Sequence, residues 1–357
     1  MKSKKYWERR AEKRMYEYQK QADVVANDIT QAYISATNEI NEEIKKIFRT
    51  FQMDRGLSEN EAYKLLNNLP DSVKLSNLKA IVSHIKDSDK QKEILNIINS
   101  PAYAYRIRRF EELQNDIDKK TKQLAEIEQS ITKEHYIDLA NTAYTRSIFD
   151  IQKGTGFLFS FSSMPLSRIE EILRINWSGR LFSKRIWGNA ADLNQKIKRE
   201  LLTGFMTGRS YAKTAAKIQE QMQVGAWEAR RLVRTESTYI ANMAEIESYK
   251  ECGIKKYRFV ATLDVKTSDM CREMDGKEFS VDNAKPGINL PPLHPWCRSI
   301  TIAVIYSAVT DSIKRRARDP KTGKTYLVPA NMTYKVWQKT LQSGGKGGII
   351  KTKGESL

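Results

Sequence analysis

The stretch Ala261–Ile302, ATLDVKTSDMCREMDGKEFSVDNAKPGINLPPLHPWCRSITI, holds residue choices that neither an ordinary core nor an ordinary surface explains. It contains two of the chain's three cysteines, Cys271 and Cys297, and one of its three histidines, His294. They lie among Asp, Gly and Pro residues, which gather where the backbone turns sharply and side chains meet a partner. We define this stretch as the signature loop and interpret the rest of the chain from it.

Segments of strand composition lie at both ends of the signature loop: KYRFVATL at 256–263 and SITIAVIY at 299–306. The loop is therefore predicted to be long, ordered and pinned between two strands. Inside it, Asp275-Gly276 predicts a tight turn into a short strand, because glycine adopts the positive φ that such a turn requires.

Three prolines surround the histidine of the signature loop. Pro291, Pro292 and Pro295 fix φ at their own positions and push each preceding residue toward an extended conformation. His294 and Cys297 are thus predicted to lie three residues apart on a stiff segment.

The signature loop also carries a resemblance to a known family. Its residues occur in the order Asp264, Thr267, Cys271, Asp275-Gly276-Lys277, Pro292-Leu293-His294-Pro295 and Cys297-Arg298. This order resembles the C-terminal signature of the phage Mu F-like minor head proteins, as do Arg234-Thr235-Glu236 and Trp177-Ser178-Gly179-Arg180 upstream. The resemblance extends from about Ile172 to Trp337. Some family members have Cys-x-x-Cys where this chain has Ser268 three residues before Cys271, and this departure places a four-ligand metal site in doubt.

The predicted fold class is α+β: a mostly helical N-terminal half with a long helix, followed by a mixed α+β C-terminal domain with few strands. The 357 residues suffice for two or three domains. We expect a helical domain at 1–153, the phage Mu F-like head morphogenesis domain at 172–306, a C-terminal hairpin and short helix at 307–341, and a disordered basic tail at 342–357.

Two long helices are predicted in the N-terminal half, at about 6–52 and 102–152. Apolar residues recur every seven positions in the second helix, but Lys120 and Glu134 interrupt the companion row. This pattern favours a helical hairpin or bundle of the two helices, and oligomerisation through the same stripe is the alternative.

Further along, the glycines at 188, 204, 208 and 225 are predicted to break the chain into compact helices. Most charges of the last of these helices, at about 226–251, are expected to form solvated ion pairs. Arg234 on that helix is expected to anchor the signature loop, by bridging to Asp264 or to a loop carbonyl.

The composition is that of a globular protein, with 40% hydrophobic and 29% charged residues. No apolar run approaches the roughly 20 residues that span a bilayer, and no signal peptide is recognised. We therefore expect a protein made and kept in a cytoplasm.

The net charge of +18 is concentrated at the ends, with +5 in residues 1–20 and +9 in residues 312–357. Basic segments attract polyanions through counterion release, so double-stranded DNA is an expected partner of the basic termini. An acidic protein surface would serve as well, and the C-terminal charge has solubility as its simpler explanation.

Three interpretations of Cys271, His294 and Cys297 remain open. In the first interpretation, the three residues ligate zinc, and Asp264, Asp269 or Asp275 is the fourth ligand. Alternatively, His294 activates water beside a metal in a small metal-dependent nuclease. In the third interpretation the cysteines pack as small apolar groups and the histidine hydrogen-bonds the loop backbone.

No phosphate-binding glycine loop, no Gly-x-Ser-x-Gly elbow and no metalloprotease helix motif is present, which argues against the corresponding enzymes.

The resemblance implies a non-enzymatic minor head protein of a tailed phage or prophage. It implies a place inside the capsid of the virion, with the host cytoplasm as the site of assembly. The implied partners are the portal protein and the capsid or scaffolding proteins, and the implied role is in head assembly and in DNA packaging or ejection. A nuclease, another DNA-processing enzyme and a general nucleoid-associated binder are the alternatives.

Overall fold

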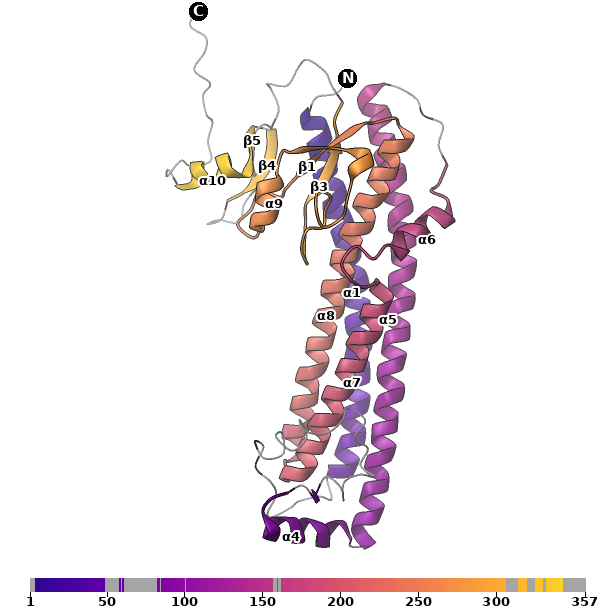
Figure 1. Cartoon of the computed structure of the whole chain (residues 1–357), viewed down its shortest axis with the longest axis vertical. Helices are drawn as coiled ribbons and strands as arrows, with labels where there is room; N and C mark the ends of the chain where they lie inside the picture. The colour runs from indigo at the N-terminus through magenta and orange to yellow at the C-terminus, as the bar shows by residue number, and fades with distance from the viewer. Residues whose placement is uncertain are drawn as a thin grey trace, which may run out of the picture. The chain divides into compact units, whose positions relative to one another are not determined.

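The fold is described from a computed structural model of the whole chain (Figure 1). It describes residues 4–48, 58, 60, 82–83, 85–99, 101–156, 159, 162–305, 314–319, 325–329 and 332–342. Its longer helices are α1 (Lys4–Phe48), α4 (Ser88–Ile98), α5 (Pro101–Thr155), α6 (Leu166–Arg174), α7 (Phe182–Thr207) and α8 (Tyr211–Glu251). Short elements follow: β1 (Lys256–Val260), α9 (Asp269–Met274), β2 (Glu278–Ser280), η2 (Val281–Asn283), β3 (Ile300–Ala303), β4 (Lys314–Arg318), β5 (Thr325–Pro329) and α10 (Tyr334–Gln342).

The predicted α+β class is confirmed, since long helices precede a C-terminal region with few antiparallel strands. The two long N-terminal helices are confirmed as α1 and α5. The predicted tail at 342–357 lies outside the described residues, except for Gln342.

The chain forms two compact units, each built from segments far apart in sequence. The first contains residues 1–26, 132–182 and 231–357, and the second contains residues 27–131 and 183–230. The long helices α1, α5 and α8 each contribute to both units. The predicted boundaries between consecutive domains stay predictions.

In the first unit, α8 is buried around almost its whole circumference. Thr235, Glu236, Ser237, Thr238, Asn242 and Glu245 are each at most 8% exposed. The expectation of solvated ion pairs is therefore wrong for Glu236 and Glu245. Because buried polar groups need partners, this helix constrains every segment that surrounds it.

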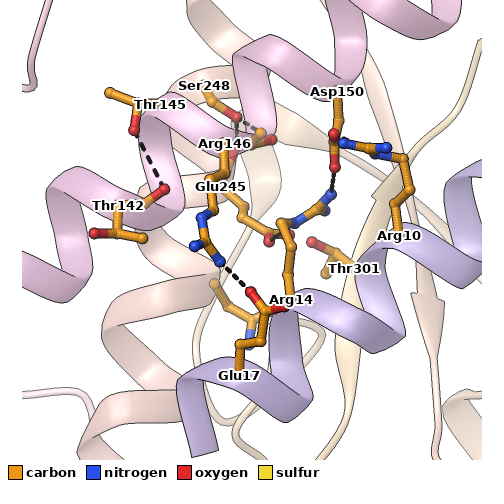
Figure 2. A network of polar contacts seen from close by, with 12 residues as sticks. Arg10, Arg14, Glu17, Thr142, Thr145, Arg146, Asp150, Glu245, Ser248 and Thr301 are labelled. Atoms are coloured by element: carbon orange, nitrogen blue, oxygen red, sulfur yellow. Dashed lines mark hydrogen bonds and ion pairs between the residues drawn. The ribbon is translucent and has the colours of Figure 1, made fainter. Parts of the chain in front are cut away.

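A buried ion cluster joins three helices of the first unit (Figure 2). Arg14 of α1 donates to Glu245 of α8 at 3.0 Å and also pairs with Asp150 of α5. Arg10 contacts the same Asp150 carboxylate. Arg14 and the two carboxylates are at most 7% exposed, so each charge depends on the others for compensation.

In the second unit, α1 and α5 pack side by side, as the interrupted heptads predicted. The hydroxyl of Tyr33 donates to Glu128 at 3.4 Å, and Lys120 pairs with Glu39. Burial raises the pKa of Glu128 to about 7, and the hydrogen bond from Tyr33 opposes that shift. These contacts confirm that α1 and α5 pack together within residues 27–48 and 101–131.

Two small antiparallel sheets complete the first unit. In the order β2-β1-β3, Tyr257 of β1 pairs with Phe279 of β2 and with Ala303 of β3. Gly276 has a φ of 82° at the turn before β2, as the Asp-Gly pair predicted. The β4–β5 hairpin and α10 confirm the predicted hairpin and short helix, and Trp337 of α10 lies in their apolar core.

The glycine prediction is wrong at three of four positions. Helix α7 continues through residues 188 and 204, α8 continues through 225, and only Gly208, with a φ of 64°, lies between them. A Cβ at Gly204 would lie 2.6 Å from Thr214 Oγ1, and one at Gly225 would lie 2.8 Å from the Tyr33 ring. Gly204 and Gly225 thus permit the close approach of Thr214 and Tyr33, respectively.

We predict that Gly204→Ala destabilises the protein by about 1–3 kcal/mol, because its Cβ overlaps the Thr214 hydroxyl and methyl groups. In Gly204→Ala/Thr214→Ala the nearest remaining contact is the Thr214 Cβ at 3.5 Å, so stability should return to at least the wild-type value. Urea unfolding of the two variants and of Thr214→Ala checks this. If Gly204→Ala and the double variant lost the same free energy of unfolding, the steric explanation would be contradicted.

Candidate metal centre

The structure brings together three donor side chains of the signature loop. Cys271 lies in α9, and His294 and Cys297 lie in the proline-rich segment before β3. The Cys271 Sγ is 3.6 Å from the Cys297 Sγ and 3.3 Å from the His294 Nε2. All three donor atoms lie within 4.8 Å of one another. Among the described residues they form a group that could hold a metal ion.

The local hydrogen bonds orient the imidazole of His294. Its Nδ1 is 2.7 Å from the Pro295 carbonyl oxygen, which can only accept, so Nδ1 carries the proton. The lone pair of Nε2 therefore faces Cys271. Metal-binding histidines commonly have their second nitrogen fixed in this way.

Both cysteines are buried in one apolar cluster with Phe259 and Ala261. Hydrogen bonds from Cys271 and His294 lower the pKa of the Cys297 thiol, and burial opposes them. The Cys271 pKa is raised, first by its hydrogen bond with Cys297 and then by burial. Cys297 is thus the thiol of the pair whose environment favours the thiolate.

The three carboxylates considered as a fourth ligand lie elsewhere. Asp264 is 4% exposed and forms a two-point ion pair with Arg298, one contact being 2.8 Å. Asp269 points to solvent and pairs with Arg272. Asp275 accepts from the backbone N–H of Ala261 and, at the start of α10, from that of Tyr334. None joins the cluster of the three donors.

Asp264 has a structural role that its environment explains. Burial alone would raise its pKa, but the Arg298 guanidinium and the Thr267 hydroxyl hold that pKa below its usual value. The Tyr334 hydroxyl also donates to the Asp264 carbonyl at 3.2 Å. Asp264 thus connects the beginning of the signature loop with its end and with α10.

Helix α8 fixes the segment that carries His294 and Cys297. The Trp296 N–H donates to Thr235 Oγ1 at 3.1 Å, and Thr238 Oγ1 donates to the Cys297 carbonyl at 2.9 Å. Trp296 has a φ of 62°, a left-handed conformation that a bulky residue adopts at a cost. These contacts with α8 hold Trp296 in the left-handed conformation.

Arg234 contacts the signature loop, but not in the predicted way. Its guanidinium lies 5.5 Å from the centre of the Trp296 ring and pairs with Asp23 of α1 at 2.6 Å. The expected bridge to Asp264 is wrong, because Arg298 already occupies that carboxylate. Arg234 therefore anchors the signature loop through the aromatic ring of Trp296.

Sequence reasoning quoted Thr235 only as part of Arg234-Thr235-Glu236, without a role, and it missed Thr238, which no spacing rule distinguishes from helical surface residues. It also missed Gln19, whose amide donates to Thr238 Oγ1 at 2.7 Å. The Trp177 motif was recognised. The Trp177 indole donates to Glu236 at 3.1 Å and stacks on Tyr239.

Residues 195–302 match the family model "Phage Mu protein F like protein". Over this segment the chain is similar to the phage Mu protein F-like family. The matched segment includes Thr235 and Thr238 as well as the three donors.

A curated relative is "NAD(+)--arginine ADP-ribosyltransferase EFV" of Enterococcus faecalis, which is 33% identical over 127 residues. The alignment covers 34% of this chain and 26% of that protein, so the chain spans about a quarter of the relative's length. No solved structure matches the chain. Within the described residues, no helix combines the length and the apolar character needed to cross a membrane.

We predict that Thr238→Val destabilises the protein by about 1–3 kcal/mol, because it removes the partner of both Gln19 and the Cys297 carbonyl inside the core. Thr145→Val is the matched control, since its hydroxyl bonds carbonyls of its own helix. Thermal unfolding of both variants measures the difference. Equal melting temperatures for the two variants would show that α8 does not anchor the loop through Thr238.

Proposed function

We propose that this chain is a minor head component of a tailed phage or prophage, incorporated in the procapsid with the portal. In this role it aids head assembly and DNA packaging or ejection, and its partners are the portal protein and capsid or scaffolding proteins. The family match over residues 195–302 carries the proposal, because the matched segment contains both the anchoring part of α8 and the signature loop.

An exposed basic surface on α1 supports contact with DNA inside the head. Arg9, Lys13, Tyr16 and Lys20 are exposed at spacings of three and four residues, so they share one side of the helix. Tyr16 is 71% exposed. Arg side chains and Lys ammonium groups bind phosphates, and exposed aromatic rings can stack on unpaired bases.

The neighbouring part of α5 extends this surface. Phe149 is 51% exposed, and Arg10 and Lys153 both lie 5.9 Å from the centre of its ring. The nearby Glu17 is already engaged, since it pairs with Arg146 and lies 3.8 Å from Lys13. We call these residues the basic-aromatic face: Arg9, Arg10, Lys13, Tyr16, Lys20, Phe149 and Lys153.

The chemistry of the donor cluster favours a structural role over a nuclease. Nuclease metals such as Mg²⁺ prefer oxygen ligands, whereas the cluster offers two sulfurs and one nitrogen. The His294 Nδ1 is bonded to the Pro295 carbonyl and its Nε2 faces Cys271, so neither nitrogen is placed to act as a general base. We therefore propose that the chain is not an enzyme.

The relative's name does not alter this proposal. Three quarters of the Enterococcus faecalis protein lies outside the alignment. We infer that the aligned part is a module common to the two proteins, and that the transferase activity named there belongs to the rest of that relative.

Mass spectrometry of purified particles tests the head assignment. We expect the chain in both DNA-filled heads and empty procapsids from the source phage or induced lysogen, at a constant ratio to the portal protein. An abundant cytoplasmic host protein serves as the contamination control. If the chain were depleted from both particles to the level of that control, while abundant in the lysate, the head assignment would be wrong.

We predict that the basic-aromatic face binds double-stranded DNA with a strong salt dependence. Replacing Arg9, Lys13 and Lys20 by Gln should make the slope of log K against log salt shallower by about 2 to 3, since each phosphate contact contributes about 0.9. The control replaces the exposed Lys184, Lys196 and Lys213 by Gln, which changes the net charge equally. Fluorescence anisotropy with a random-sequence duplex measures both slopes.

Equal slopes for the two triple variants would show that binding depends on net charge and not on this face. DNA recovered from the same samples, incubated with Mg²⁺ or Zn²⁺, should run intact on a gel. Cleavage that disappears in His294→Ala would instead support the nuclease.

A further inference from the structure

We propose that Cys271, His294 and Cys297 bind one zinc ion, which joins α9 to the segment that α8 holds. This inference goes beyond the head assignment and does not depend on it. It rests on the positions of the three donors, on the orientation of the imidazole, and on the burial of the sulfurs.

The spacing of the donors fits a tetrahedral ion. Two sulfurs at about 2.3 Å from zinc lie about 3.8 Å apart at the tetrahedral angle, and a sulfur and a nitrogen lie about 3.6 Å apart. The observed separations are 3.6 Å between the sulfurs and 3.3 Å between the Cys271 Sγ and the His294 Nε2. Small movements of the side chains would therefore admit the ion.

The donor set also selects the metal. Two thiolates and an imidazole suit zinc, whereas Mg²⁺ and Ca²⁺ require oxygen ligands. The protonated Nδ1 of His294, fixed by the Pro295 carbonyl, leaves Nε2 free to coordinate. Since no described carboxylate joins the cluster, a water molecule completes the four ligands.

The surroundings are inconsistent with a reactive thiol. Cys271 is 1% exposed and Cys297 is 0% exposed, so neither sulfur is accessible to a substrate. The close pairing of two buried thiols with an imidazole is accounted for by coordination. A metal at this position would connect residues 26 positions apart, and the Thr238 bond to Cys297 would transmit that connection to α8.

Cobalt substitution tests the proposal directly. The chain is purified without a metal-affinity tag, chelated, and titrated with Co²⁺. We expect one equivalent to produce the sulfur-to-cobalt charge-transfer band and the d–d bands of tetrahedral Co²⁺, and one equivalent of Zn²⁺ to remove them. Zinc content by mass spectrometry of the untreated protein should be one per chain.

The third cysteine supplies a matched control. Cys271→Ser and Cys297→Ser should each lose the charge-transfer intensity or the stoichiometric binding, whereas Cys252→Ser should keep both, because Cys252 lies outside the cluster. Bands that persist at full intensity with one equivalent of Co²⁺ in Cys271→Ser, or that vanish in Cys252→Ser, would overturn the assignment.

A measurement on the wild type covers the case in which a variant fails to fold. Zinc should raise the melting temperature of the chelated chain, and added chelator should return it. If the chelated chain neither takes up Co²⁺ at one equivalent nor changes its melting temperature with Zn²⁺, the two cysteines pack as small apolar groups and the proposal is wrong.

Discussion

The structure of the first unit depends on one constraint: α8 is buried on nearly all sides although it carries a run of polar residues. Residues 234–239 point around the whole helix, because successive positions are about 100° apart. The run therefore meets several segments. Arg234 contacts α1 and the signature loop, Glu236 meets Trp177, and Thr238 meets the loop. Burying these polar groups costs free energy unless each has a hydrogen-bond or ion-pair partner. The polar residues of α8 therefore determine which segments can pack against the helix.

The donor cluster follows from this constraint. Thr235 and Thr238 hold the backbone on either side of the Trp296–Cys297 peptide, which sets the positions of His294 and Cys297. The sheet of β1, β2 and β3 holds the other end of the loop, where α9 presents Cys271. Helix α8 and the sheet thus position the three donor side chains from two different sides of the loop. The arrangement explains why residues 26 positions apart meet in a loop with little regular structure.

Sequence patterns predicted much of the fold, because they reflect local physics. The apolar repeat of α5, the strands on both sides of the loop and the Asp275-Gly276 turn each depend on a few adjacent residues. The glycines show the limit of such reasoning. Gly204 and Gly225 look like helix breaks, yet they face Thr214 and Tyr33 across helix contacts that only the tertiary structure reveals. Likewise, Cys271, His294 and Cys297 were recognised by type and spacing, whereas the pairing of Asp264 with Arg298 depends on packing.

A buried polar helix, an anchored loop and a three-donor cluster lie within the one segment that matches the phage Mu protein F-like family. A crystal structure of the zinc-loaded protein, with data collected at the zinc absorption edge, tests that connection most directly. We predict one anomalous peak about 2.3 Å from both sulfurs and about 2.0 Å from the His294 Nε2, with Trp296 and Cys297 still bonded to α8. A peak at another site, or a loop detached from Thr235 and Thr238 around the ion, would contradict it.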